Sequence, residues 1–96
     1  MIPTRTKYPT EAKVYSFDFT QKLDVGDSIP VQVPVMDVDA GLTASNAVLD
    51  TASNTVSIRI SGGLAGQSYN VAATVTTTLG DKLKLALTLE VTNAAN

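Results

Sequence analysis

The residues most able to do chemistry in this chain are aspartates in two short segments. Asp24 and Asp27 lie in the first, and Asp37 and Asp39 precede Gly41 in the second. Their carboxylates could in principle bind a hard cation such as calcium. The spacing does not match an EF-hand loop, because Gly41 takes the third ligand position and no Glu follows at the required distance. Asp-stabilised turns explain these residues equally well, so we assign no metal ligand and leave open whether a cation binds near them.

Catalytic side chains are scarce. The chain has no His and no Cys, which removes imidazole proton transfer and thiolate attack. Acid–base catalysis by two carboxylates would need a cleft in which their pKa values differ. Every acid except Asp18 and Glu90 lies in or beside a predicted turn, and those two lie on outward faces. The glycines of residues 62–66 lack the Lys-Ser or Lys-Thr of a phosphate loop. We therefore predict no catalytic residue and no cofactor, and a protein that is not an enzyme.

Size and charge narrow the class further. The 96 residues suffice for one domain, and the absence of Cys means a domain without a disulfide. The formal net charge is only −2, and no apolar run could cross a bilayer, so we expect neither nucleic acid nor a membrane as partner. The basic start of the chain has no apolar stretch behind it, so we expect no signal peptide.

A two-residue alternation of apolar and polar side chains indicates that the elements of this chain are β-strands. It is clearest in residues 82–91, where every odd position is Leu or Val. Successive side chains of a strand point to opposite faces, so the pattern predicts a half-buried strand. Further strands are predicted over residues 13–19, 42–49, 56–61 and 67–78, with inward faces formed by Tyr15, Phe17, Phe19, Val56, Ile58, Ile60, Tyr69, Val71, Ala73 and Val75.

Residues 29–36 alternate in the same way but contain two prolines. Ile29, Val31, Val33 and Val35 share one face, and the prolines lie on the other. Since Pro30 and Pro34 cannot donate to a ladder, we predict an edge strand here.

Six or seven short strands at intervals of about 8–12 residues are typical of a sandwich. We predict an all-β fold: a single small antiparallel β-sandwich, immunoglobulin-like, without a disulfide. The predicted organisation is an extended N-terminal arm over residues 1–10, the sandwich over 11–92 and a polar tail over 93–96. Because the arm contains Pro3 and Pro9, we expect it to be extended and to dock on a neighbour, and its deletion to leave the fold intact.

Two groups of residues are candidates for protein contacts. One is a row of short, outward side chains on the last two strands. This row is either a plain solvated face or a face packed against another subunit. The second alternative is considered because the row is nearly uncharged and interface centres are depleted in charge. The other group belongs to the arm. The candidate interface residues are Ile2, Pro3, Arg5, Tyr8, Pro9, Thr74, Thr76 and Thr88.

Three stretches of the sequence resemble a known family. Residues 24–29 read DVGDSI after Phe17-Asp18-Phe19. Gly41-Leu42-Thr43 leads through a polar stretch to residues 56–66, which read VSIRISGGLAG. Tyr69-Asn70-Val71 leads to residues 75–81, which read VTTTLGD, and to the closing strand. In these stretches, over roughly residues 7–92, the chain resembles the small immunoglobulin-like structural proteins of tailed bacteriophages, of the fibre–tail adaptor type. It departs from that pattern in having no Trp.

The resemblance implies a non-enzymatic virion protein, made in the cytoplasm of a bacterial host, that links tail fibres to the tail or connector. Its implied partners are other virion proteins (tail, fibre, portal or connector, or capsid), and it would act as a homo-oligomeric ring or in several copies per particle. A capsid decoration or cement protein is an alternative. A carbohydrate-binding or adhesive β module is another, although such modules use exposed aromatics and only Tyr8 lies outside the predicted strands.

Overall fold

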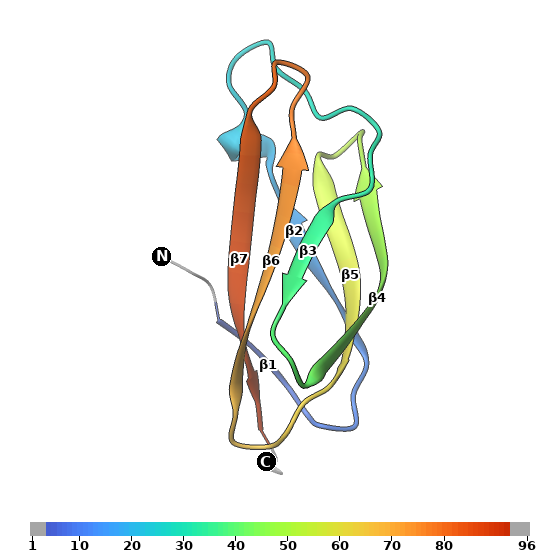
Figure 1. Ribbon diagram of the computed structural model, residues 1–96, viewed down its shortest axis with the longest axis vertical. Helices are drawn as coiled ribbons and strands as arrows, with labels where there is room; N and C mark the ends of the chain where they lie inside the picture. Colours follow the sequence, from blue (N-terminus) through green and yellow to red (C-terminus); the bar gives the residue numbers. More distant parts are fainter. Residues whose placement is uncertain (1–3, 93–96) are drawn as a thin grey trace.

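The computed structural model describes residues 4–92, which form two β-sheets packed face to face (Figure 1). The one helical element in this range is a single 3-10 turn, η1 (Thr20–Lys22), and no helix there could cross a membrane. The strands are β1 (Thr4–Lys7), β2 (Lys13–Asp18), β3 (Val35–Val38), β4 (Leu42–Asp50), β5 (Thr55–Gly62), β6 (Ser68–Thr76) and β7 (Lys82–Val91). The predicted all-β sandwich is confirmed.

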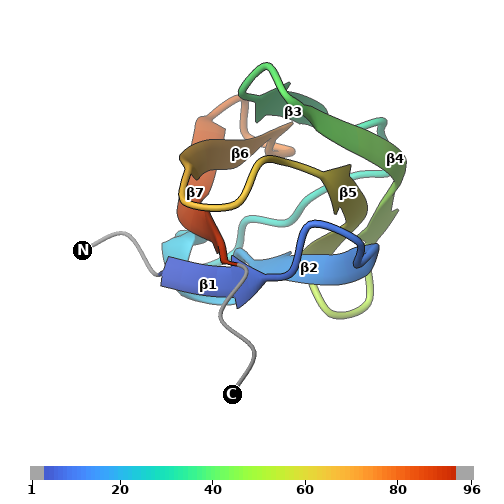
Figure 2. The same cartoon turned by 90° about the horizontal axis from the view of Figure 1, so that it is seen from below.

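The strand order is that of an immunoglobulin-like domain. One sheet has the order β1-β7-β6-β3 and is called here the β7 sheet; the other has the order β2-β5-β4 and is called the β5 sheet. Lettered A to G, the second to seventh strands give B-E-D in one sheet and C-F-G in the other, as in immunoglobulin domains. Figure 2, viewed along the strands, shows β6 and β7 on one side and β4 and β5 on the other.

The first strand corrects two expectations. β1 pairs in parallel with β7, from Thr4 opposite Thr88 to Lys7 opposite Val91, so the sandwich is not wholly antiparallel. Residues 4–7 of the expected arm are therefore part of a sheet, and an unanchored arm is wrong for them. The physical reason is the free edge of β7: β6 pairs with one side of that strand, and its other side offers backbone groups that need partners. The predicted polar tail, residues 93–96, lies outside the described residues.

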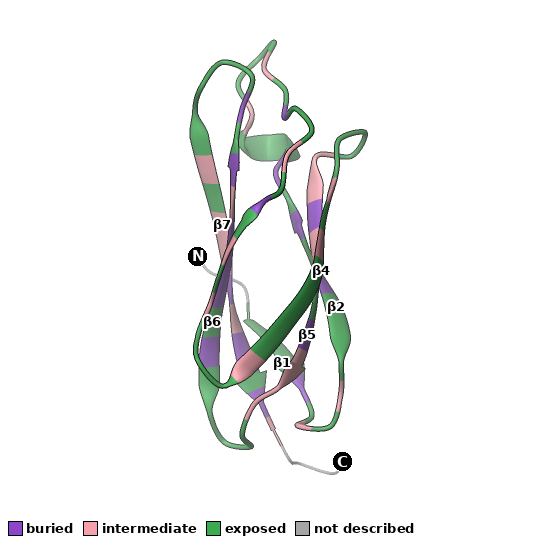
Figure 3. Cartoon of the chain, turned by 45° about the vertical axis from the view of Figure 1, so that its right-hand side comes forward, coloured by how far each residue is buried: buried purple, intermediate pink, exposed green. Residues whose placement is uncertain are grey.

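The inner faces of the two sheets form the core as the alternation predicts. Figure 3 marks the buried residues in purple along both sheets. The predicted inward residues of β2, β5 and β6 are all buried, and in β7 the buried residues are Leu87, Leu89 and Val91, with Leu83 and Leu85 partly buried. Since no Cys is present, this apolar contact between the sheets takes the place of the usual disulfide.

The segment before β3 differs from the prediction. The strand covers Val35–Val38 rather than residues 29–36, although it does lie at the edge of its sheet, paired with β6 alone. Ile29 and Pro34 are buried, while Val31 and Val33 are 89% and 85% exposed, and Val35 is exposed too. These three valines therefore do not face the core. Because Pro30 and Pro34 have no N–H, the regular ladder with β6 does not extend past Val35. Before that point Pro34 is buried and the valines face outward.

A tyrosine fixes the turn between β5 and β6. The Tyr69 hydroxyl accepts a hydrogen bond of 2.9 Å from the backbone N–H of Leu64. This is the tyrosine corner of immunoglobulin-like folds, in which a Tyr near the start of the sixth strand binds backbone a few residues upstream. Gly63 makes it possible, because its φ is +95° and a Cβ there would lie 2.7 Å from Val91 Cγ2.

We expect Tyr69→Phe to destabilise the fold by about 1 kcal/mol, since the Leu64 N–H would lose its partner while the ring stayed in place. Thermal unfolding should show a midpoint lower by roughly 4–8 °C. Tyr8→Phe removes a hydroxyl from an exposed ring and is the matched control. Equal midpoints for the two variants would contradict the role given to the Tyr69 hydroxyl.

Candidate docking surfaces

The predicted interface residues lie in two separate places. Thr74, Thr76 and Thr88 lie on the outer face of the β7 sheet, at positions that alternate with the core residues. Arg5, Tyr8 and Pro9 lie in β1 and the loop after it; Ile2 and Pro3 lie outside the described residues. The structure therefore does not bring the predicted residues together into one site.

The outer face of the β7 sheet is built from small side chains. Ala72 lies opposite Ala86, and Asn70 opposite Thr88, which in turn lies opposite Thr4 of β1. One ion pair spans this face, between Lys84 Nζ and Asp37 Oδ2 at 3.9 Å. A face of this kind allows the backbone of a partner to approach closely.

Lys7 anchors β1 to the rest of the fold. Its side chain is 2% exposed, and its Nζ donates to the carbonyl oxygens of Tyr8 at 2.7 Å and Gly62 at 2.6 Å. Desolvation lowers the pKa of the ammonium group, and the charge of Glu11 offsets part of that effect. The ammonium thus joins β1 to the end of β5. Sequence reasoning missed it, because a lysine in a polar segment is normally solvated.

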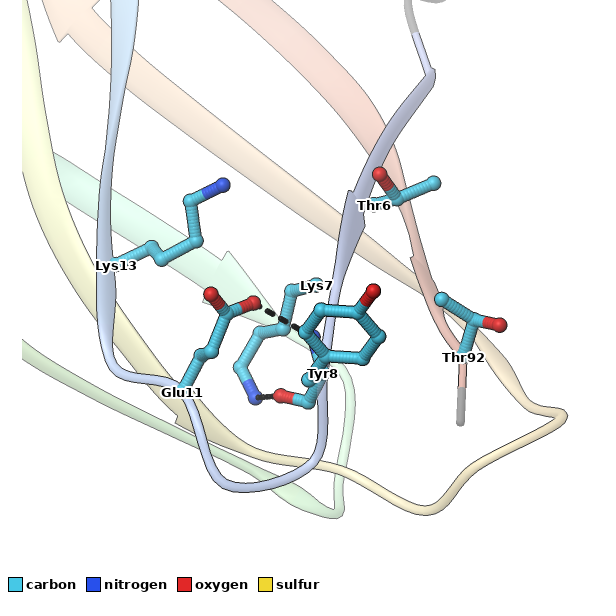
Figure 4. A pocket seen from close by; sticks show the side chains of 6 residues that line it. All are labelled: Thr6, Lys7, Tyr8, Glu11, Lys13 and Thr92. Carbon is cyan, nitrogen blue, oxygen red and sulfur yellow. Dashed lines mark hydrogen bonds between the residues drawn. The ribbon is translucent and has the colours of Figure 1, made fainter. Parts of the chain in front are cut away.

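A hollow of about 170 Å³ lies between β1, the start of β2 and the end of β7. Figure 4 shows its lining and the two hydrogen bonds that order it, from Lys7 Nζ to the Tyr8 carbonyl and from the Tyr8 N–H to Glu11 Oε1. The ammonium of Lys7 and one oxygen of Glu11 are thus engaged by the chain's own backbone. Its lining residues are Thr6, Lys7, Tyr8, Glu11, Lys13 and Thr92.

Three of the four aspartates that could have bound a cation have separate partners within the fold. Asp27 Oδ1 accepts hydrogen bonds from the N–H groups of Ser28 and Leu79. Asp39 Oδ2 accepts one from the Asn70 N–H at 2.8 Å, and Asp37 pairs with Lys84. Within residues 4–92 no three acidic, His or Cys side chains gather closely enough to hold a metal ion. These contacts favour the structural interpretation of the aspartates.

A comparison with protein families identifies most of this chain. A family model described as "Podophage GP4 fiber-tail adaptor protein gp77" matches residues 7–90, which is most of the chain. A search of curated proteins found no match.

We expect Lys7→Ala to cost about 2 kcal/mol of folding free energy, because two carbonyl oxygens lose a charged donor and a buried stem is removed. Chemical denaturation measures this directly. Lys13→Ala changes an exposed lysine beside the same hollow and should shift the free energy of unfolding by no more than about 0.5 kcal/mol. If Lys7→Ala has the same free energy of unfolding as Lys13→Ala, the Lys7 side chain does not anchor β1.

Asp27 gives the fold a predictable acid sensitivity. Burial raises the pKa of its carboxyl group, but hydrogen bonding, which includes that from the N–H groups of Ser28 and Leu79, outweighs this effect and leaves the pKa below its usual value. A carboxyl group with a depressed pKa in the folded state stabilises the protein above its unfolded pKa of about 4, and this contribution is lost as the pH falls through the folded pKa.

Asp27→Asn should therefore show a shallower loss of stability than the wild type as the pH is lowered below about 4. Urea unfolding at a series of pH values measures the slope. Asp24→Asn removes the same charge from the same loop and controls for net charge. If Asp27→Asn loses stability with falling pH as steeply as the wild type, the Asp27 carboxylate does not stabilise the fold in this way.

Proposed function

Because this chain belongs to the podophage fiber-tail adaptor family, we propose that it joins fibre and tail through two separate surfaces and performs no catalysis. A fibre–tail adaptor is a component of the virion tail, and its task is to bind other virion proteins. The absence of catalysis is supported by the chain itself. Asp27, Asp37 and Asp39 are engaged in turns or in an ion pair rather than gathered around a cleft.

The two-surface proposal rests on the distance between the two ends of the sandwich. The principal extents of the molecule are 46 × 25 × 21 Å, with the strands running along the longest axis (Figure 1). The loops between β1 and β2 and between β5 and β6 lie at one end, and the turn between β6 and β7 lies at the other. The continuous core makes the body between them rigid, so two partners can be held at a fixed separation.

We also propose that several copies assemble side by side, as a ring, through the outer face of the β7 sheet. Thr74, Thr76 and Thr88 lie on this face, and its centre is formed by Ala72 and Ala86. Interface centres are depleted in charged residues, and this composition fits that rule. In the N-terminal segment, Ile2, Pro3, Arg5, Tyr8 and Pro9 remain proposed contacts with a neighbour. For Arg5 that contact would be made by a strand held in the sheet, not by a free arm.

Reconstitution on particles tests the proposal. Particles from a phage lacking the adaptor are mixed with purified fibres, with or without the purified chain, and are then sedimented and imaged by electron microscopy. Fibres should sediment with the particles only when the chain is added, and its density should appear at the tail. Fibre attachment without the chain would refute the adaptor role, and density on the head shell would favour a capsid decoration protein instead.

A further inference from the structure

Several exposed apolar side chains lie at one end of the sandwich. This loop end, defined as residues 23–34 and 77–81, lies at the top of Figure 1, and its two segments are hydrogen-bonded between Ser28 and Thr78. It presents the exposed side chains of Val25, Val31, Val33 and Leu79, and Val35 continues the row into β3. Apolar groups that project together from a surface mark a site of protein contact more often than isolated ones do.

Val31 and Val33 project outward from a segment that is itself held in place. The Gln32 side chain replaces a ladder pair: its Nε2 donates to the Thr76 carbonyl at 2.7 Å, and its Oε1 accepts from the Thr76 N–H at 2.9 Å. Ile29 before the valines and Pro34 after them are buried. Val31 and Val33 are thus fixed in the conformation that a partner would meet, which lowers the entropy cost of binding.

The same segment is poorly suited to adding a strand. Pro30 and Pro34 have no N–H, so an incoming strand could not form a regular ladder along residues 30–34. A partner would therefore contact the valine side chains themselves. A shallow apolar groove fits a row of short, β-branched side chains better than a flat polar surface does.

Charge is unevenly distributed between the two ends. The loop end and the strand termini beside it carry five acids against two lysines, a net charge of −3: Asp18, Asp24, Asp27, Asp50 and Asp81, with Lys22 and Lys82. The opposite end carries four bases against three acids, a net charge of +1: Arg5, Lys7, Lys13 and Arg59, with Glu11, Asp39 and Glu90. Asp37 and Lys84 pair between the ends. A partner of the loop end should accordingly carry positive charge around its contact surface.

From these observations we infer that the loop end docks into a virion protein whose surface has an apolar groove flanked by lysine or arginine. The inference rests on the proposed adaptor function and assigns one of its two surfaces. The opposite end and the outer face of the β7 sheet remain free for the other partner and for neighbouring copies.

The test compares two double variants of the full chain. Val31→Ser/Val33→Ser removes the centre of the row, and Val14→Ser/Val48→Ser removes two exposed valines from β2 and β4 of the β5 sheet as the matched control. Each protein is titrated against purified fibre protein and against particles lacking the adaptor, and its self-association is measured by sedimentation. Equal unfolding midpoints verify that both variants fold.

The loop-end variant should bind one of the two partners at least about tenfold more weakly and the other as the wild type does, while the control binds both normally. The lost interaction should also weaken as salt is raised, and Asp24→Asn/Asp81→Asn should reduce that salt dependence. Wild-type binding by the loop-end variant, an equal loss in the control, or a change confined to self-association would overturn the inference. Failure of the wild-type chain to bind either partner would instead refute the adaptor function.

Discussion

The fold depends on the burial of one face of every central strand against the opposite sheet. Val56 and Ile60 of β5 and Val71 and Leu89 of the facing sheet are completely buried, and they come from strands in which every second side chain is apolar. No disulfide crosses between the sheets, so this contact is the main source of stability. The tyrosine corner at Tyr69 then fixes where β5 ends and β6 begins.

That alternation is also why much of the fold can be predicted from the sequence. The core faces of β2, β5, β6 and β7, the sandwich architecture and the resemblance to phage adaptors all follow from residues that pack or turn locally, and all are confirmed. Two features could not be predicted in the same way. The pairing of β1 with β7 joins the two ends of the chain, and four mostly polar residues give no periodic signal for it. Residues 29–36 do alternate, but Pro30 and Pro34 interrupt the ladder on which that interpretation depends.

The candidate surfaces also include residues that the sequence predicts and residues that it does not. Thr74, Thr76 and Thr88 share an outer face because they occupy alternate positions of confirmed strands. The burial of Lys7 and the exposure of the row around Val31 could not be predicted, because lysines are normally exposed and valines are normally buried. Such reversals depend on distant partners. Lys7 needs the carbonyl of Gly62, and Val31 faces outward beside Gln32, which is held by Thr76. They are therefore visible only in the folded chain.

In the proposed role, the chain would hold its two partners apart by the rigidity and length of its body. The body is 46 Å long, its loop end is apolar and acidic, and its opposite end is weakly basic. The most direct measurement is a cryo-electron microscopy map of the intact tail with its fibres, at a resolution that traces individual strands. Each copy should lie between fibre and tail, with residues 23–34 covered by one of these partners. A map in which that loop end faces solvent, while both partners contact the same sheet face, would contradict this arrangement.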